Sequence, residues 1–514
     1  MKIVTSEQMQ KIDGAAILSG ISRERLMENA GRAVFKIISK VYAPIKTKKV
    51  LILCAKGNNT GDGLVAARYL MQKGGKVSFC FLEDPALFKG ETLENYKKLF
   101  RESPSESLFD QTRFRIPELI RCLKKEIQKT DLIIDALFGT GLNANIKGKY
   151  KTTIELVNKS QKPVISIDIP SGVNGTTGDV MGVAVMADFT VTFGLPKVGF
   201  FLPPGIDYVG KLFIQNIGFP KRLLNHTSHE ASLIDANILK KIPKRKKSAH
   251  KGSGGHVLVF AGSPGKLGAA IMTVQAAFRT GSGLVTLLTH PKSQKEFLKK
   301  AFEAFLDTYD QADFELQKYL KDKKAIAFGP GIGVTETTKK LLHFLIQKNR
   351  KPIIIDADGL TLLAQDLKIL KQKKAPLILT PHPGEMARLL KSHPRERGDL
   401  KKEVQKNRLQ ISKTFAKKHG VYLILKGAAT VIATPNGKLY INPTGNPVMA
   451  TAGMGDVLTG MLLSFLGQGL GVETACQLAV YAHGKIADLW AEKKKTTRGF
   501  MASDLIREIP KFLG

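Results

Sequence analysis

Ala452-Gly453-Met454-Gly455-Asp456-Val457-Leu458 is the most informative stretch of this sequence, because a glycine-rich turn runs directly into the apolar segment Val457 to Leu466. We predict that the apolar segment is a helix and that the amides of the turn face an anion above its N-terminus. The carboxylate of Asp456 then stands where a phosphoryl group and a substrate hydroxyl can meet. Gly-x-Gly-Asp also occurs in ordinary turns, so the pattern gains weight only beside other nucleotide-type loops.

Four polar loops precede this turn in the second half of the chain, and each directly follows a strand-like segment. The loops are Gly329 to Gly333, Asp356 to Gly359, Thr380 to Glu385 and Lys426 to Thr430. The predicted strands of this half are His256 to Phe260, Leu284 to Leu288, Ala325 to Phe328, Pro352 to Ile355, Leu377 to Leu379 and Val421 to Leu425, and Ala269 to Arg279 is a predicted helix. Because ligands of open α/β sheets bind outside the carboxyl ends of the strands, we expect the loops and the turn to form one polar site.

The first half of the chain shows the same alternation of strand-like and helix-like segments. Its predicted strands are Lys49 to Cys54, Lys76 to Leu82, Leu132 to Ala136, Val164 to Ile169 and Phe189 to Phe193, with helices over Gly63 to Gln72 and, as one or two elements, over Ser6 to Ile38. Such alternation is typical of parallel sheets covered by helices. We therefore predict two α/β domains, residues 1–225 and 235–514, in a chain of 514 residues.

Polar residues also follow the strands of the first half. A loop with two adjacent asparagines, Gly57 to Gly63, separates a strand from a helix, and Asp135 and Asp168 each stand at the end of a buried strand. A single aspartate at a strand end is most often a helix cap or a turn former. Together these residues are better explained as one polar site, whose oxygen atoms suit a hard cation better than zinc.

Composition excludes several classes of protein. Hydrophobic residues make up 43% of the chain, yet no apolar window approaches the roughly 18 residues of a membrane span, so we expect no membrane partner. The N-terminus has neither the apolar core of a signal peptide nor the arginine-rich character of a transit peptide. The four cysteines lack metal-type spacing, and Cys54 and Cys80 lie in apolar strands, which favours buried thiols in a reducing cytoplasm.

The net charge of +35 raises the possibility of a nucleic-acid partner. Against it, the lysines are spread along the whole chain, and aromatic residues amount to only 7% with no stacking pattern near the basic runs. The densest basic segment, Lys240 to Lys251, lies where we expect a linker between the domains. We predict no nucleic-acid binding, and anionic small substrates explain the charge equally well.

The polar loops of the first half resemble those of the NAD(P)H-hydrate epimerase domain, in Gly57-Asn58-Asn59-x-Gly61-Asp62-Gly63, Asp135, Gly139-Thr140-Gly141 and Asp168-Ile169-Pro170-Ser171-Gly172. The resemblance implies a Rossmann-like three-layer fold that interconverts the two C6 epimers of hydrated NADH and NADPH. It implies that the hydrate contacts Asn58, Asn59, Thr60, Gly61, Asp62, Gly139, Thr140, Gly141, Leu142, Asn143, Ala144, Asn145 and Asp168, and that Asn59, Asp135 and Ser171 hold K⁺. We predict that Asp168 moves the proton. Thr60 replaces the usual glycine and would be strained if that position required a positive φ.

The second half resembles the ADP-dependent NAD(P)H-hydrate dehydratase domain, a relative of the ribokinase-type kinases. The motifs are His250-Lys251-Gly252-x-x-Gly255-His256, Gly268-Ala269-Ala270, Gly329-Pro330-Gly331-x-Gly333, Thr380-Pro381-His382 with Glu385, Lys426-Gly427 and Gly453-Met454-Gly455-Asp456. The resemblance implies a ribokinase-like α/β fold in which ADP is held by Lys426, Gly427, Ala428, Ala429, Thr430, Asn446, Gly453 and Gly455. It implies that the hydrate contacts Ala270, Gly331, Gly333, His382 and Asp456, that Asp456 is the catalytic base, and that Mg²⁺ assists phosphoryl transfer.

Both resemblances together cover almost the whole chain and imply repair of hydrated NADH and NADPH by a cytoplasmic homo-oligomer. Two other functions share part of the pattern. A ribokinase-like kinase of a small alcohol, with the first half as a regulatory domain, would use the same Gly-x-Gly-Asp turn. A nucleotide-sensing or RNA-associated protein without activity would use the basic surface. The Asn58-Asn59 loop favours repair over the kinase, and Asp456 and Lys426 disfavour an inactive binding protein.

Overall fold

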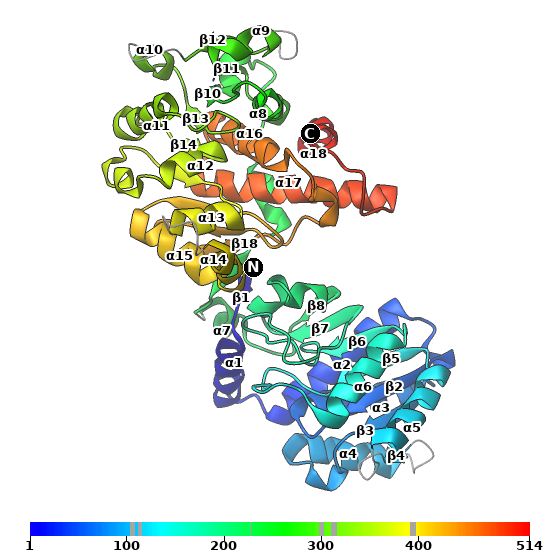
Figure 1. The fold of residues 1–514 in the computed structure, drawn as a ribbon. Coiled ribbons are helices and arrows are strands. Elements are labelled where there is room, and N and C mark those ends of the chain that lie inside the picture. The colour runs from blue at the N-terminus through cyan, green and yellow to red at the C-terminus, as the bar shows by residue number, and fades with distance from the viewer. Residues whose placement is uncertain (103–107, 111–115, 227, 298–302, 310–315, 391–396) are drawn as a thin grey trace. The chain divides into compact units, whose positions relative to one another are not determined.

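The computed structural model describes residues 1–102, 108–110, 116–226, 228–297, 303–309, 316–390 and 397–514 (Figure 1). The chain forms two compact units, one over Lys2–Ala231 and the other over Ser232–Gly514 together with Met1. Within the described ranges, no helix has the length and the apolar character that a bilayer crossing requires.

The first unit is built on a sheet in which all neighbouring strands are parallel, in the order β4-β3-β2-β5-β6-β7-β8. The strands are β2 (Lys49–Cys54), β3 (Lys76–Phe81), β4 (Leu108–Asp110), β5 (Leu132–Ala136), β6 (Val164–Ile167), β7 (Phe189–Phe193) and β8 (Lys211–Gln215). The helices are α1 (Ser6–Leu18), α2 (Arg23–Val41), α3 (Asn58–Gln72), α4 (Gly90–Glu102), α5 (Ile116–Lys129), α6 (Gly148–Lys159) and α7 (Lys221–His226).

Strand β2 explains why this unit has three layers. Its side chains point alternately to the two faces of the sheet, Ile52 into one core and Leu51 and Leu53 into the other. Leu64 and Leu70 of α3 belong to the first core, whereas α5 and α6 contribute to the second. The predicted parallel sheet covered on both faces is confirmed.

The second unit is built on a larger sheet, in the order β9-β18-β17-β16-β15-β14-β13-β10-β11-β12. All of these strands pair in parallel except β17, which is antiparallel to both neighbours. The strands are β9 (Ala231–Leu233), β10 (His256–Phe260), β11 (Leu284–Thr289), β12 (Phe305–Thr308), β13 (Ala325–Phe328), β14 (Ile353–Ile355), β15 (Leu377–Leu379), β16 (Tyr422–Leu425), β17 (Val431–Ala433) and β18 (Leu439–Ile441).

The helices of the second unit include one that is almost wholly enclosed by its neighbours. They are α8 (Leu267–Thr280), α9 (Gln294–Phe297), α10 (Leu316–Leu320), α11 (Glu336–Lys348), α12 (Asp358–Leu363), α13 (Pro383–Leu390), α14 (Arg397–Lys406), α15 (Arg408–His419), α16 (Met454–Gly467), α17 (Val472–Lys494) and α18 (Ala502–Leu513). Nearly every residue of α16 is buried, and the helix packs on α8 and α17. Gly460 permits this packing, because a Cβ atom there would lie 2.3 Å from the carbonyl oxygen of Thr273 in α8.

The predicted strands are confirmed, with differences of one or two residues at some ends. Strands β4 and β8 were missed, and both lie at edges of the first sheet, where short segments carry a weak apolar pattern. The two helices that follow the glycine-rich loops begin earlier than predicted, α3 at Asn58 and α16 at Met454. The polar motifs therefore form the first turns of these helices rather than loops in front of them.

Candidate active sites

The first unit contains a cavity of about 740 Å³ outside the carboxyl ends of β2, β5 and β6. Among the predicted contact residues, Asn58, Asn59, Asp62, Asp168 and the loop Gly139–Asn143 line it. Helix α1 forms another part of the wall and adds Asp13, which sequence reasoning missed. The predicted contacts Thr60, Gly61, Ala144 and Asn145 are not among the lining residues in the described part of the chain. Most of the predicted contact residues of this unit therefore line one cavity.

The three residues predicted to hold a cation lie close together, and of these Asn59 lines the cavity whereas Asp135 and Ser171 are buried behind its wall. Asp135 is fully buried, and its carboxylate accepts hydrogen bonds from the Ser171 hydroxyl (2.5 Å), the Ser171 amide (2.8 Å) and the Ser166 hydroxyl (2.8 Å). The amide of Asn59 donates to the carbonyl oxygen of Phe138 (3.1 Å), which also lies 3.4 Å from the Ser171 hydroxyl. Burial raises the pKa of Asp135, and the hydrogen bonds from Ser171 and Ser166 oppose that shift.

Thr60 is not strained. It lies in the first turn of α3, and a positive φ at this position is absent from the described backbone. Its hydroxyl accepts a hydrogen bond from the amide of Ala55 (2.8 Å) and donates one to the carbonyl oxygen of Ala136 (2.9 Å). The threonine therefore ties the start of α3 to the ends of β2 and β5, and the expectation of a positive φ there is corrected.

Asp168, the predicted proton-transfer group, is held by a buried lysine that the sequence did not reveal. Lys197 is only 1% exposed, and its ammonium lies 2.5 Å from Oδ1 of Asp168. The Thr192 hydroxyl donates to the same oxygen at 3.1 Å. Asp168 has φ +62°, a left-handed conformation that is uncommon for a residue other than glycine and recurs at functional sites.

Two further carboxyl groups share the cavity with this ion pair. Burial raises the pKa of Asp13 to about 6, with Lys197 opposing the shift and Asp168 adding to it. Burial also raises the pKa of Asp62 well above its ordinary value, and Asp168 and Asp13 add to that shift. The cavity therefore combines one carboxylate paired with an ammonium and two carboxyl groups that retain protons more readily.

In the second unit, Asp456 lies in the first turn of α16, whereas the sequence predicts it in a turn ahead of the helix. Gly453 caps the helix with φ +87°, and the side chain of a larger residue there would meet Met272. A Cβ atom on Gly455 would lie 3.2 Å from the ammonium of Lys426 and 3.7 Å from Oδ2 of Asp356. The two glycines thus let the helix start approach a charged cluster closely.

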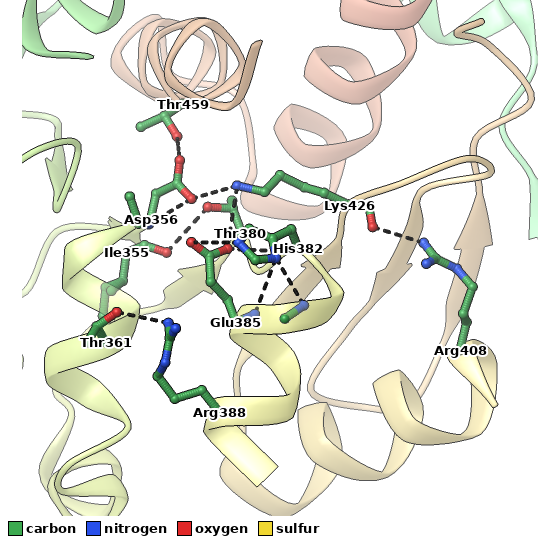
Figure 2. A network of polar contacts seen from close by, with 12 residues as sticks. Ile355, Asp356, Thr361, Thr380, His382, Glu385, Arg388, Arg408, Lys426 and Thr459 are labelled. Carbon is green, nitrogen blue, oxygen red and sulfur yellow. Dashed lines mark hydrogen bonds and ion pairs between the residues drawn. The ribbon is translucent and has the colours of Figure 1, made fainter. Parts of the chain in front are cut away.

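Figure 2 shows that cluster, in which Lys426 lies between two carboxylates. The ammonium of Lys426 donates to Oδ1 of Asp356 at 2.8 Å and lies 3.9 Å from Oε2 of Glu385. The other oxygen of Asp356 accepts a hydrogen bond from the Thr459 hydroxyl of α16 at 2.8 Å. Burial would lower the pKa of Lys426, but Asp356 and Glu385 outweigh it and the pKa lies above its ordinary value. Lys426 therefore carries a positive charge beside the helix start.

The same cluster tunes the predicted base. Burial raises the pKa of Asp456 to about 7; Asp356 and Glu385 add to the shift, and Lys426 opposes it. A carboxylate that is half protonated near neutral pH is well matched to proton transfer.

The predicted hydrate contacts of the second unit lie on loops tied to this cluster. The amide of His382 donates to Oε2 of Glu385 at 2.8 Å, and the His382 ring stays exposed. Oδ2 of Asp358 accepts the amide of Gly333 (2.9 Å) and the ammonium of Lys266 (3.0 Å). Gly331 lies against Lys266.

Two predicted contacts lie elsewhere. Ala270 is fully buried in the core of α8, so its side chain has no exposed surface. Asn446 donates to Oδ1 of Asp488 (2.9 Å) and lines a second cavity of about 690 Å³ with Lys495 and Arg498. Neither residue belongs to the network of Figure 2.

The predicted nucleotide loop, residues 426–430, rests on a buried arginine that sequence reasoning missed. The guanidinium of Arg408 donates to the carbonyl oxygens of Leu425 (2.9 Å) and Lys426 (3.2 Å). Gly427 and Ala428 are exposed, and Ala429 has φ +53°. In the described ranges, no group of three His, Cys, Asp or Glu side chains is arranged to bind a metal ion.

Comparisons with known proteins cover both units. Residues 257–511 match a family model described as NAD(P)H-hydrate dehydratase, and residues 23–199 match one described as YjeF-related protein N-terminus. The chain is 38% identical to the bifunctional NAD(P)H-hydrate repair enzyme Nnr of Thermofilum pendens, over 100% of this chain and 96% of that protein. It is 36% identical to the enzyme of the same name from Moorella thermoacetica, over 99% and 96%. A crystal structure of the ADP/ATP-dependent NAD(P)H-hydrate dehydratase from Bacillus subtilis, co-crystallised with ATP and Mg²⁺, superposes with a TM-score of 0.47 and 30% identity, over 55% of this chain and 97% of that chain.

Proposed function

Because this chain belongs to the family of bifunctional NAD(P)H-hydrate repair enzymes, we propose that each of the two sites performs one half of the repair. The cavity of the first unit interconverts the R and S hydrates at C6. The cluster around Asp456 dehydrates the S hydrate with ADP and gives NAD(P)H, AMP and phosphate. Spontaneous hydration produces both epimers, so the first activity supplies the second with substrate.

The observation that carries the dehydratase assignment is the placement of Asp456 beside Lys426 at the N-terminus of α16. Hydroxide is a poor leaving group, and transfer of the terminal phosphoryl group of ADP to the C6 oxygen converts it into phosphate. Asp456 accepts the hydroxyl proton as the oxygen attacks phosphorus and the bond to AMP breaks. The ring nitrogen then expels phosphate, and loss of a proton from C5 restores the dihydropyridine. Lys426 and the amides of the first turn stabilise the charge on the phosphoryl group.

We assign ADP to residues 426–430 and to the α16 turn. The exposed backbone of Gly427 and Ala428 and the charge of Lys426 support this assignment. Mg²⁺ would bind mainly through the nucleotide phosphates and water, as is usual for this ion, and would neutralise phosphate charge.

Asn59, Asp135 and Ser171, which lie beside the first cavity, fit a potassium ion. Asp135 is fully buried and is hydrogen-bonded to hydroxyl and amide groups, so a cation would balance its charge. Asn59, Asp135 and Ser171 would hold the ion, which would fix the neighbouring loops around the hydrate.

We also propose that the enzyme works as a homo-oligomer in the cytoplasm. The four cysteines are free, and Cys54 and Cys80 are buried, which agrees with reducing surroundings. Light scattering of the purified protein would measure its oligomeric state.

One assay tests the whole assignment. A mixture of both NADH hydrates is incubated with the protein and ADP or ATP, and the dihydronicotinamide absorbance is followed in the near ultraviolet. We expect complete recovery with wild type, rapid recovery of only the S half with Asp168→Ala, and no recovery with Asp456→Asn. Accumulation of a stable phosphate ester from another alcohol, without hydrate repair, would instead establish the kinase, which the full-length relatives do not favour.

A further inference from the structure

Lys197 is too enclosed to act on the hydrate directly. An ammonium group has three donors, and those of Lys197 face Oδ1 of Asp168 (2.5 Å), the Thr192 hydroxyl (2.8 Å) and the Phe193 carbonyl oxygen (3.4 Å). With its donors occupied and 1% of its side chain exposed, Lys197 acts through Asp168. It is a positioning residue that pairs with this carboxylate and fixes its orientation.

Asp168 presents one oxygen to the cavity. Its Oδ1 is occupied by Lys197 and Thr192, whereas Oδ2 has no hydrogen-bond partner within the described residues. Oδ2 lies 3.7 Å from the position of a Cβ atom on Gly139, in the loop that lines the cavity. One oxygen is therefore anchored, and the other is available to a substrate.

Asp13 stands on a different element, α1, and faces the same cavity and the same ion pair. It is half-buried, and its carboxyl group makes no hydrogen bond to another described side chain or backbone group. Its carboxyl group retains a proton at higher pH than an ordinary aspartate, because burial raises its pKa to about 6. Asp62 shares the cavity from α3, and burial raises its pKa as well, with Asp168 and Asp13 adding to the shift.

We propose that Asp13 and Asp168 are the acid and the base of the epimerase, with Lys197 as the residue that positions the base. The inference rests on the epimerase function proposed above. Asp13 donates its proton to the C6 hydroxyl, the C6–O bond breaks, and water leaves while the ring nitrogen lone pair forms a C=N bond to C6. Water then adds to the opposite face of C6, and Asp168 takes its proton. Return of that proton to Asp13 through solvent completes the cycle, in which nothing is oxidised or reduced.

The surplus of carboxyl groups suits this sequence of steps. The intermediate carries positive charge on the ring, and Asp13, Asp62 and Asp168 line the cavity; among the described lining residues, Lys197 is the one buried cation. The other ionisable groups that line the cavity are Arg23, Lys56, Glu91 and Tyr150.

The test uses the full chain and purified R hydrate of NADH without ADP, and chromatography measures the S hydrate formed above the spontaneous rate. Asp13→Asn should lower kcat about 100-fold or more, with KM changed less than about threefold. Glu7→Gln, an exposed carboxylate on the same helix, is the matched control and should match wild type. Dehydration of purified S hydrate with ADP reports independently on the second unit and should be equal in all variants.

Two further measurements separate a chemical role from a structural one. For wild type, kcat should fall as pH rises through about 6, since the acid form of Asp13 is lost, and Asp13→Asn should lose this limb while Asp13→Glu keeps it. In water enriched in ¹⁸O, the S hydrate should carry the label at C6. Unchanged kcat in Asp13→Asn, or S hydrate without label, would overturn the proposal even with an active wild type, whereas an inactive wild type would refute the epimerase itself.

Lys197 has its own test. Lys197→Ala should lower kcat more than KM is raised, and propylammonium should restore part of the loss because it can supply the missing charge beside Asp168. Propanol, a neutral molecule of similar size, should not restore activity. Equal effects of the two additives would show that Lys197 has only a structural role.

Discussion

Asp456 can act as a base only as a carboxylate, and burial, with the acidic groups around it, raises its pKa to about 7. Since the carboxylate fraction grows as pH rises, dehydratase kcat/KM should increase through about pH 7 and then level. Asp456→Asn should lower kcat by about 100-fold to 10,000-fold. Stopped-flow measurement with purified S hydrate and ADP checks both predictions, with Glu508→Gln, at a half-exposed carboxylate of α18, as the control. A flat profile between pH 6 and pH 8 would contradict Asp456 as the base.

Lys426 compensates a charge that would otherwise be buried alone. Its pair with Asp356 is enclosed, whereas Lys438 pairs with Glu473 at 3.3 Å on the surface, where 55% of the Lys438 side chain is exposed. Lys426→Met should lower the free energy of unfolding by about 3–5 kcal/mol, because Asp356 is left uncompensated. The control Lys438→Met should change it by less than about 1 kcal/mol. Denaturant unfolding of both variants measures the difference. Equal losses would show that the enclosed pair with Asp356 stabilises the fold no more than a surface pair does.

A potassium ion held by Asp135, as proposed above, should make the first unit respond to monovalent cations. If K⁺ binds the folded site, the melting temperature of this unit should rise with KCl but not with choline chloride. Asp135→Asn should abolish the difference, while Asp179→Asn, at a half-exposed carboxylate that accepts a hydrogen bond from Thr177, should preserve it. Calorimetry in the two salts gives the result. An identical response of wild type to both salts would argue against a cation at Asp135.

At the scale of elements, the motifs located the ends of the strands correctly but placed the starts of the helices too late. Glycine and polar residues in Gly57 to Asp62 and in Gly453 to Asp456 indicated loops, yet tertiary packing brings most of them into the first turns of α3 and α16. Lys197 and Arg408 were missed for a related reason. Each follows an apolar or helical segment without a motif of its own, and only the fold reveals what its charge contacts.

The packing of α16 on α8 depends on the absence of a side chain at Gly460. Gly460→Ala should destabilise the second unit by about 1–3 kcal/mol, because its methyl group would overlap the Thr273 carbonyl oxygen. Gly268→Ala at the start of α8 meets nothing within 4 Å and should be neutral or stabilising. Thermal unfolding compares the two variants. An unchanged melting temperature for Gly460→Ala would show that α8 and α16 can move apart without a loss of stability.

At the scale of the whole molecule, the sequence predicted two α/β units and both activities, because each unit carries its own set of motifs. The chain divides into compact units between Ala231 and Ser232, and the domain ranges 1–225 and 235–514 stay a prediction. The sequence could predict which polar residues lie close together, because the loops after parallel strands all lie at the same edge of the sheet. The networks behind them could not, because contacts such as Asp356 with Lys426 join residues far apart in the chain.

If each unit completes its own reaction, the two activities should complement each other between molecules. An equal mixture of Asp168→Ala and Asp456→Asn should repair both hydrates completely, because the free hydrate diffuses from one variant to the other. Each variant alone should stop at half recovery or at none. Absorbance time courses of the mixture test this, and failure of the mixture with active single domains would mean that the hydrate must stay within one chain.

Thr60 offers a consequence for enzyme engineering. Its hydroxyl hydrogen-bonds both the amide of Ala55 and the carbonyl oxygen of Ala136, and the residue does not line the cavity of the first unit. In a homologue with glycine at this position, a Gly→Thr substitution should therefore stabilise the first unit. Because this residue does not line the cavity, the substitution should leave the nicotinamide site of a cofactor-recycling enzyme unchanged.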